Sequence, residues 1–173
     1  QLKHIGNLRT TPEDYYQIIS GKTAGPFEAG CKAAAIVAGA DAQMIDILGQ
    51  FGLELGLAFQ IVDDLLDLEG DERMGKPRGT DVIEGKMTLP LIHTLTLSHG
   101  EDRRRLAEII SHFDDGLWDE LTTLLNRSGS MGYARTLVNN HLARAMDALF
   151  QFPESESRNA LEWLTRQVME RNE

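Results

Sequence analysis

Residues 59–67 read Phe-Gln-Ile-Val-Asp-Asp-Leu-Leu-Asp, and this stretch decides the interpretation of the fold. Three carboxylates fall within five residues of an otherwise apolar run. On an α-helix, which turns by about 100° per residue, Gln60, Asp63, Asp64 and Asp67 share an arc of roughly 100°. The stretch therefore predicts a long apolar helix that carries one acidic face.

The same helix face continues toward the N-terminus as a row of glycines, Gly49, Gly52 and Gly56. A helix face without side chains leaves room for close approach. Either a neighbouring helix or a substrate chain could lie against this face.

Outside this stretch the pattern is helical nearly everywhere, with apolar residues three to four positions apart. Thr11 and Pro12 form a helix start signal, and Gly21 predicts an interruption. We find no sustained alternation typical of strands, so the fold class is all-α, a helical bundle. The expected helices are 12–20, 26–40, 41–68, 88–99, 102–112, 117–127, 131–150 and 153–170.

Length and composition limit the function classes. The chain has 173 residues, 42% of them hydrophobic and 25% charged, which is typical of a globular protein and predicts a single domain over 1–173. The formal net charge of −10 disfavours nucleic acid as a partner. The sequence contains no run of 18 or more uncharged apolar residues, so we expect no membrane span. The chain does not begin with Met, and we interpret it as a processed chain, a cloned segment or a fragment.

Cys31 is the single cysteine, so an internal disulfide is excluded and a reducing, cytoplasmic location fits. Its position among Ala and Gly predicts a small core residue. Asp114 and Asp115 are paired acids at a predicted helix start, where capping is the expected role. The five histidines include no HxxxH pair, so His93, His99, His112 and His141 are expected at surfaces or helix ends.

The acidic stretch and its flanking lysines point to a metal and a diphosphate. Clustered carboxylates repel one another, and a hard cation such as Mg²⁺, which shares its coordination with phosphates, relieves the repulsion. By itself the acidic stretch also fits a solvated helix end, and a lone lysine fits a surface charge. Three lysines at loops or helix breaks strengthen the first interpretation because they can bind a diphosphate: Lys22, Lys76 and Lys86.

The motifs together resemble the C-terminal half of the trans-isoprenyl diphosphate (polyprenyl) synthases. The motifs are Gly21-Lys22-Thr23, Phe59-Gln60 with Asp63-Asp64-x-x-Asp67, Gly75-Lys76-x-x-Gly79-x-Asp81 and Gly85-Lys86-x-Thr88-Leu89-Pro90. They occur in the family's order and spacing over residues 2–97, whereas the later helices match only in character.

The resemblance implies an all-α bundle of the isoprenoid synthase type that binds Mg²⁺ and joins isopentenyl diphosphate to an allylic diphosphate. It implies that Asp63 ligates a Mg²⁺ ion, and that Asp64 and Asp67 support the site directly or through water. It also implies that Lys22 and Lys76 hold the allylic diphosphate, that Thr23 and Gln60 lie near the reacting carbons, and that Lys86 belongs to a closing loop. The glycine row would border the cavity, and the complete protein would be a homodimer.

The chain departs from the family by lacking the first aspartate-rich motif, its nearby arginine and the isopentenyl diphosphate pocket. We therefore expect the isolated chain to be inactive. Two alternatives remain, a half-length or non-catalytic subunit that needs a partner chain, and a fragment of a class I terpene cyclase. The sequence does not give the length of the product.

Overall fold

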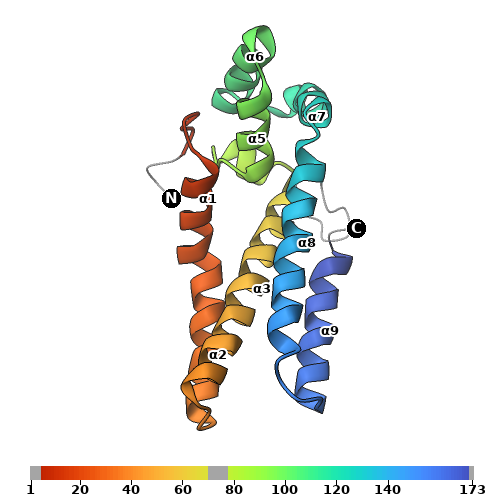
Figure 1. Cartoon of the computed structure of the whole chain (residues 1–173). Coiled ribbons are helices and arrows are strands. Elements are labelled where there is room, and N and C mark those ends of the chain that lie inside the picture. Colours follow the sequence, from red (N-terminus) through yellow and green to blue (C-terminus); the bar gives the residue numbers. More distant parts are fainter. Residues whose placement is uncertain (1–4, 70–77, 172–173) are drawn as a thin grey trace. The chain divides into compact units, whose positions relative to one another are not determined.

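We analysed a computed structural model, which describes residues 5–69 and 78–171. Within these ranges all the regular structure is helical, which confirms the all-α prediction. The helices, shown in Figure 1, are α1 (Pro12–Ile19), η2 (Ser20–Ala24), α2 (Gly25–Val37), α3 (Ala42–Glu69), α4 (Thr80–Ile83), α5 (Leu89–Leu97), α6 (Gly100–Ser111), η4 (Asp115–Leu117), α7 (Trp118–Arg127), α8 (Ser130–Leu149) and α9 (Glu156–Glu170).

The chain divides into two compact units, each with its own buried side chains. Unit 1 comprises Gln1–Tyr15 and Asp63–Ala134, and unit 2 comprises Tyr16–Val62 and Arg135–Glu173. The single-domain assignment over 1–173 stays a prediction.

Unit 2 contains most of α3, and Figure 1 shows α2 and α8 running beside it and α9 running beside α8. Its fully buried side chains come largely from α3 and α8 and include Phe51, Ile61, Val138, Leu142 and Leu149. By length and composition α3 is the one helix in the described residues that could cross a membrane, yet 61% of that window is buried inside the chain. A mostly buried apolar helix is also what the core of a water-soluble bundle contains.

Unit 1 contains α4 to α7, which pack around a second apolar core. Side chains from α5, α6 and α7 fill this core, among them Leu91, Ile92, Leu106, Ile109 and Leu121, all of them 2% exposed or less. The unit also contains the last turns of α3 and the start of α1.

Local signals set several helix starts as predicted. Asp14 N donates to Thr11 Oγ1 (3.2 Å) and Thr11 N donates to Asp14 Oδ2 (3.0 Å), which is a reciprocal cap at the start of α1. Asp114 accepts a hydrogen bond from Gly116 N at 2.8 Å, as its expected capping role requires.

Three expectations were wrong in detail. Gly21 does not interrupt the chain's helix, because a π-helical turn, η2, connects α1 to α2 without a break. The last helix begins at Glu156 rather than Pro153, because Ser155 accepts a hydrogen bond from Arg158 N (3.1 Å) and caps it there. Cys31 is half-buried rather than a core residue, although its Sγ lies beside Gly52 of α3.

Candidate active site

In unit 1, the last acid of the motif holds the turn that follows α3. Gly79 N donates to the Asp67 backbone oxygen at 2.8 Å, and Asp81 N donates to Asp67 Oδ2 at 2.9 Å. Burial is the largest cause raising the pKa of the Asp67 carboxyl, and the charge of Asp81 raises it further, while backbone N–H donors act in the opposite direction. A cation placed beside Asp67 would therefore relieve a carboxylate that the fold leaves partly desolvated.

Lys86 binds the acidic side chains that follow the same turn. Its Nζ donates to Asp81 Oδ1 at 2.6 Å and lies 2.7 Å from Glu84 Oε2. Burial on its own would lower the pKa of Lys86, but the hydrogen bonds and charges of these two acids outweigh burial and raise it. Lys86 is thus a firmly charged cation held by two carboxylates of its own loop.

The three motif acids occupy different environments. Asp64 is 6% exposed and accepts a hydrogen bond from the Tyr15 hydroxyl at 2.6 Å, whereas Asp63 and Asp67 are half-buried. Among the residues that the structure describes, no group of three His, Cys, Asp or Glu side chains is close enough to hold a metal ion. The donors present are all carboxylate oxygens, which suit Mg²⁺, and Mg²⁺ needs one or two of them when phosphate supplies the rest.

In unit 2, the predicted polar residues meet as a pair. Thr23 Oγ1 donates to Gln60 Oε1 at 2.7 Å, and Gln60 is 5% exposed. Thr23 lies in the π-helical turn η2, which also carries the exposed Lys22. Single π-helical turns inside α-helices are frequent at functional sites.

The glycine row of α3 packs against η2 and α2, which decides between its two possible occupants. A Cβ at Gly52 would lie 2.6 Å from the Phe27 carbonyl oxygen, and one at Gly56 would lie 2.7 Å from Ala24 Cα. At Gly49 the neighbour is the Lys32 side chain of α2, a flexible group rather than backbone. The expectation that these glycines border a cavity is therefore wrong, because a neighbouring helix occupies the space.

The comparisons with known proteins agree with one another. The family model for polyprenyl synthetase matches residues 1–124. A short chain isoprenyl diphosphate synthase of Methanothermobacter thermautotrophicus is 39% identical over 165 residues, which are 95% of this chain and 51% of that protein. The chain belongs to the polyprenyl synthetase family.

Solved structures of this family share the fold. A decaprenyl diphosphate synthase from Rhodobacter capsulatus superposes with a TM-score of 0.93 at 33% identity, over 100% of this chain and 54% of that one. A polyprenyl synthase from Caulobacter crescentus, complexed with calcium and isoprenyl diphosphate, gives 0.91 at 34% identity, over 100% and 54%. The chain thus spans about half the length of the relatives that it matches.

Not every predicted site residue of this polyprenyl synthetase chain can be placed. Lys76 lies outside the described residues. Asp67 and Lys86 contact the same acid, Asp81, in unit 1, and Thr23 and Gln60 contact each other in unit 2. The substrate contacts of these residues and of Lys22 stay predictions.

Sequence reasoning missed a buried polar network in unit 2. Glu54 is 6% exposed, and one of its carboxylate oxygens lies 2.6 Å from His141 Nδ1 and accepts a hydrogen bond from Arg144 Nε at 2.9 Å. Its other carboxylate oxygen accepts a hydrogen bond from Gln50 Nε2 at 2.7 Å. The Tyr16 hydroxyl lies 2.9 Å from His141 Nε2. His141, 5% exposed, is therefore an interior residue, and its expected surface location was wrong. The sequence did contain one sign of this network, an acidic residue at position 54 within an otherwise apolar helix.

Proposed function

We propose that this chain contributes the second aspartate-rich motif and the allylic diphosphate lysines of a Mg²⁺-dependent prenyltransferase. The complete protein would condense isopentenyl diphosphate with an allylic diphosphate to make polyprenyl diphosphates in isoprenoid biosynthesis. The observation that carries this proposal is the half-buried Asp67 carboxylate facing Asp81, with Lys86 on the same turn, in a polyprenyl synthetase chain. The relative crystallised with calcium and isoprenyl diphosphate supports a divalent cation and a diphosphate as ligands.

The acids and lysines divide the work of binding. Asp63 and Asp67, with Asp64 in support, would hold Mg²⁺. When bound, the metal supplies positive charge that stabilises the departing diphosphate. Lys22 and Lys76 would bind the allylic diphosphate oxygens, and Lys86 would add a contact by exchanging one of its carboxylate partners for phosphate.

The Thr23–Gln60 pair would act on the carbon side of the substrate. The hydrogen bond from Thr23 orients the Gln60 amide, and an oriented amide dipole can stabilise a nearby allylic cation. Gln60 is 5% exposed on the apolar helix α3, and such burial would keep water from quenching the cation. Condensation ends with carbon–carbon bond formation and loss of a proton from the isopentenyl unit.

The remaining parts of the proposal concern the setting of the protein. With a net charge of −10, the anionic substrates approach through the metal and the lysines rather than through the surface as a whole. We propose a cytoplasmic enzyme without a membrane span or a nucleic acid partner, and a homodimer for the complete protein. We also propose that these 173 residues are inactive by themselves, because they span about half of the relatives they match.

A chimera tests the activity. This chain replaces the matching half of the Rhodobacter capsulatus decaprenyl diphosphate synthase, which it covers over 54% of that protein's length. We expect radiolabelled isopentenyl diphosphate to enter prenyl products when Mg²⁺ and an allylic diphosphate are present. Chelation with EDTA, or the Asp67→Asn substitution, should abolish incorporation, whereas the exposed Asp147→Asn control should not.

The outcomes distinguish the alternatives. A chimera that melts cooperatively but makes no prenyl product would contradict the proposal. Steady product formation by the isolated chain would contradict its proposed inactivity, and activity only with a separate natural partner would indicate a half-length subunit. A hydrocarbon product made without consumption of isopentenyl diphosphate would indicate a terpene cyclase.

A further inference from the structure

Trp118, the first residue of α7, packs directly on the backbone of the turn that follows the acidic motif. Gly79 adopts the left-handed conformation with φ of 74°, and a Cβ built on it would lie 2.4 Å from Trp118 Cζ3. The guanidinium of Arg78 lies over the same ring, 4.8 Å from its centroid. The indole is 6% exposed, so it occupies the space that a side chain at position 79 would need.

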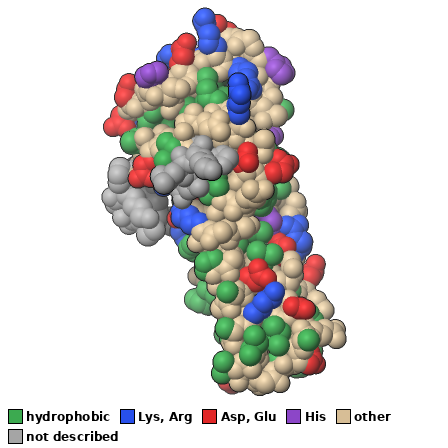
Figure 2. Space-filling model, turned by 90° about the vertical axis from the view of Figure 1, so that its left-hand side faces the viewer, with side chains coloured by type: hydrophobic (Ala, Val, Ile, Leu, Met, Phe, Trp, Pro, Cys, Tyr) green, Lys and Arg blue, Asp and Glu red, His purple; other side chains and the backbone are tan. Residues whose placement is uncertain are grey.

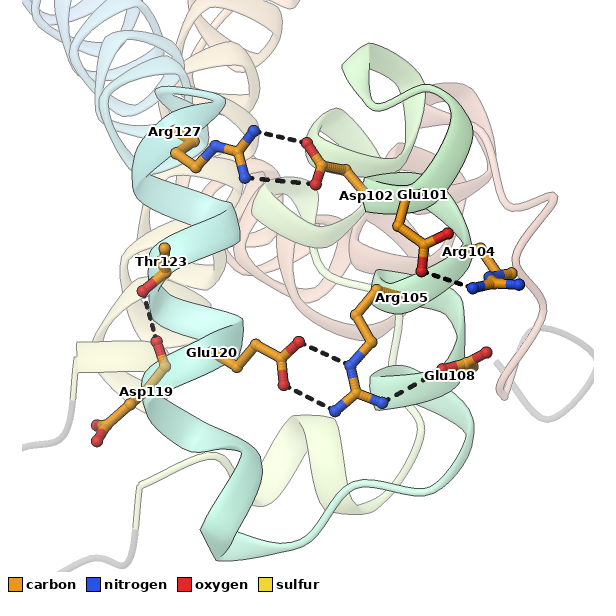
Figure 3. A network of polar contacts seen from close by, with 9 residues as sticks. All are labelled: Glu101, Asp102, Arg104, Arg105, Glu108, Asp119, Glu120, Thr123 and Arg127. Carbon is orange, nitrogen blue, oxygen red and sulfur yellow. Dashed lines mark hydrogen bonds and ion pairs between the residues drawn. The ribbon is translucent and has the colours of Figure 1, made fainter.

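The ring itself is held in place by unit 1. Phe113 meets it edge to face, with 5.7 Å between the ring centroids. Two residues further along α7, Glu120 forms a two-pronged ion pair with Arg105 of α6, with Nε to Oε1 at 2.6 Å and Nη2 to Oε2 at 2.7 Å (Figure 3). A bidentate pair of this kind fixes orientation as well as distance, so α7 presents the indole from a defined position.

On its other side the turn is bonded to the acidic motif. Gly79 and Asp81 both donate their backbone N–H groups to Asp67, one to its carbonyl oxygen and one to its carboxylate, and Asp81 holds Lys86. A shift of Gly79 would therefore move the donor that orients the Asp67 carboxylate. Groups that orient a metal ligand in this way affect metal affinity although they do not touch the metal.

We propose that Trp118 is a positioning residue for the Asp67 carboxylate, acting through the backbone of the turn Arg78–Asp81. The inference rests on the proposed function, because it takes Asp67 as a metal ligand. Trp118 lies outside the motifs that carry the family resemblance, although within the residues that the family model matches.

The first test measures the turn itself by amide hydrogen exchange of Gly79 and Asp81, followed by NMR. Trp118→Leu removes the aromatic face, Trp118→Phe keeps a smaller ring, and Trp163→Phe replaces an exposed tryptophan of α9 as the matched control. We expect faster exchange of both amides in Trp118→Leu, an intermediate rate in Trp118→Phe and the parent rate in Trp163→Phe. Unchanged exchange in a folded Trp118→Leu chain would overturn the inference. If Trp118→Leu does not fold, unchanged exchange of both amides in Trp118→Phe would overturn it instead.

The second test measures the metal site, with the Mn²⁺–diphosphate complex as the probe and water proton relaxation as the readout. We expect Trp118→Leu to weaken binding about 10-fold, as loss of a group that orients a ligand does. In an Asp67→Asn background, Trp118→Leu should cause no further loss.

The outcomes separate the two proposals. Equal binding by the parent and Trp118→Leu, with loss in Asp67→Asn, would overturn the role of Trp118 and leave the proposed function standing. Equal binding by the parent and Asp67→Asn, or none by either, would overturn Asp67 as a ligand and the inference with it, whatever the amide exchange shows.

Discussion

At the scale of single residues, the buried pair Tyr15 and Asp64 gives the sharpest stability test. The Tyr15 hydroxyl donates to Asp64 Oδ2 at 2.6 Å, and both side chains are less than 7% exposed. Tyr15→Phe leaves a buried carboxylate short of one donor, which costs about 1–3 kcal/mol. Urea unfolding should therefore show a lower free energy of unfolding for Tyr15→Phe.

The matched control is Tyr133→Phe, whose ring stacks on His93 with 4.1 Å between centroids. The phenyl ring keeps this stacking, so we expect a change within about 0.5 kcal/mol. Equal losses in the two variants would contradict the importance of the Asp64 hydrogen bond.

Glu54 predicts how stability depends on pH. Burial on its own would raise the pKa of the Glu54 carboxyl, but the hydrogen bonds and charges of His141 and Arg144 outweigh burial and lower the pKa below its ordinary value of 4.5. A depressed carboxyl pKa stabilises the fold above the unfolded-state pKa, and that stability is lost as the pH falls through the folded-state pKa. Glu54→Gln should therefore reduce the loss of stability on acidification below pH 4.5.

The measurement is the free energy of unfolding of the parent and the variant across this acidic range. Glu154→Gln, at an exposed acid between α8 and α9, is the control and should follow the parent curve. Parallel curves for the parent and Glu54→Gln would show that the network does not hold Glu54 in its charged form.

The same residues show what sequence can and cannot predict at this scale. Thr11 and Asp114 were predicted correctly because a cap depends on residues three or fewer positions away. His141 was placed wrongly because its partner Glu54 lies 87 positions away, and no local pattern links the two. Tyr15 and Asp64, 49 positions apart, escaped prediction for the same reason.

At the scale of helices, we expect glycine-to-alanine substitutions in α3 and in α2 to change stability in opposite directions. Gly56→Ala would place a Cβ 2.7 Å from Ala24 Cα, so the two helices must move apart, at a cost of about 1–3 kcal/mol. Gly30→Ala, in the middle of α2, meets no atom within 4 Å and should stabilise the chain by about 0.5–1 kcal/mol. Thermal melting of both variants should show shifts of opposite sign.

The contrast between Gly56 and Gly30 separates packing from helix propensity. Propensity alone favours alanine at both positions, so stabilisation by both substitutions would contradict the close contact between α2 and α3.

The exposed side of α2 is apolar in its own right. Ile36 is 60% and Val37 is 89% exposed, and Figure 2 shows apolar side chains gathered in the lower part of the face on which α2 lies.

The sequence pattern located α2 to within three residues of its ends, because Ala and Gly persist along it. It did not reveal the π-turn before it, since the pattern at Gly21 also fits a break.

At the scale of the whole molecule, the fold class and the family followed from the sequence, whereas the relation between site residues did not. Periodicity and motif spacing are local along the chain, and both survive in a chain that spans about half of its relatives. The placement of Trp118 on Gly79 and of α2 on the glycine row depends on tertiary packing, which those signals do not encode.

Charge provides the last prediction, the response of the chain's stability to metal. Burial and the neighbouring Asp81 raise the pKa of Asp67, so its ionised form costs stability at neutral pH when no cation is present. Asp67→Asn removes this cost, and its side-chain oxygen can still accept from Asp81 N. Without metal, Asp67→Asn should therefore melt at the same temperature as the parent or above it.

Adding Mg²⁺ with inorganic diphosphate should reverse that order. A ligand at about 100 times its dissociation constant stabilises the form that binds it by about 2.7 kcal/mol, which raises the melting temperature by several degrees in a chain of this size. The parent and Asp147→Asn, which changes an exposed acid of α8, should both gain this stability, whereas Asp67→Asn should not. If Asp67→Asn gains as much as the parent, the cation does not depend on the Asp67 carboxylate, which contradicts its proposed role as a ligand. If only Asp67→Asn loses this gain, the metal binds at a carboxylate whose pKa is raised by burial and by Asp81.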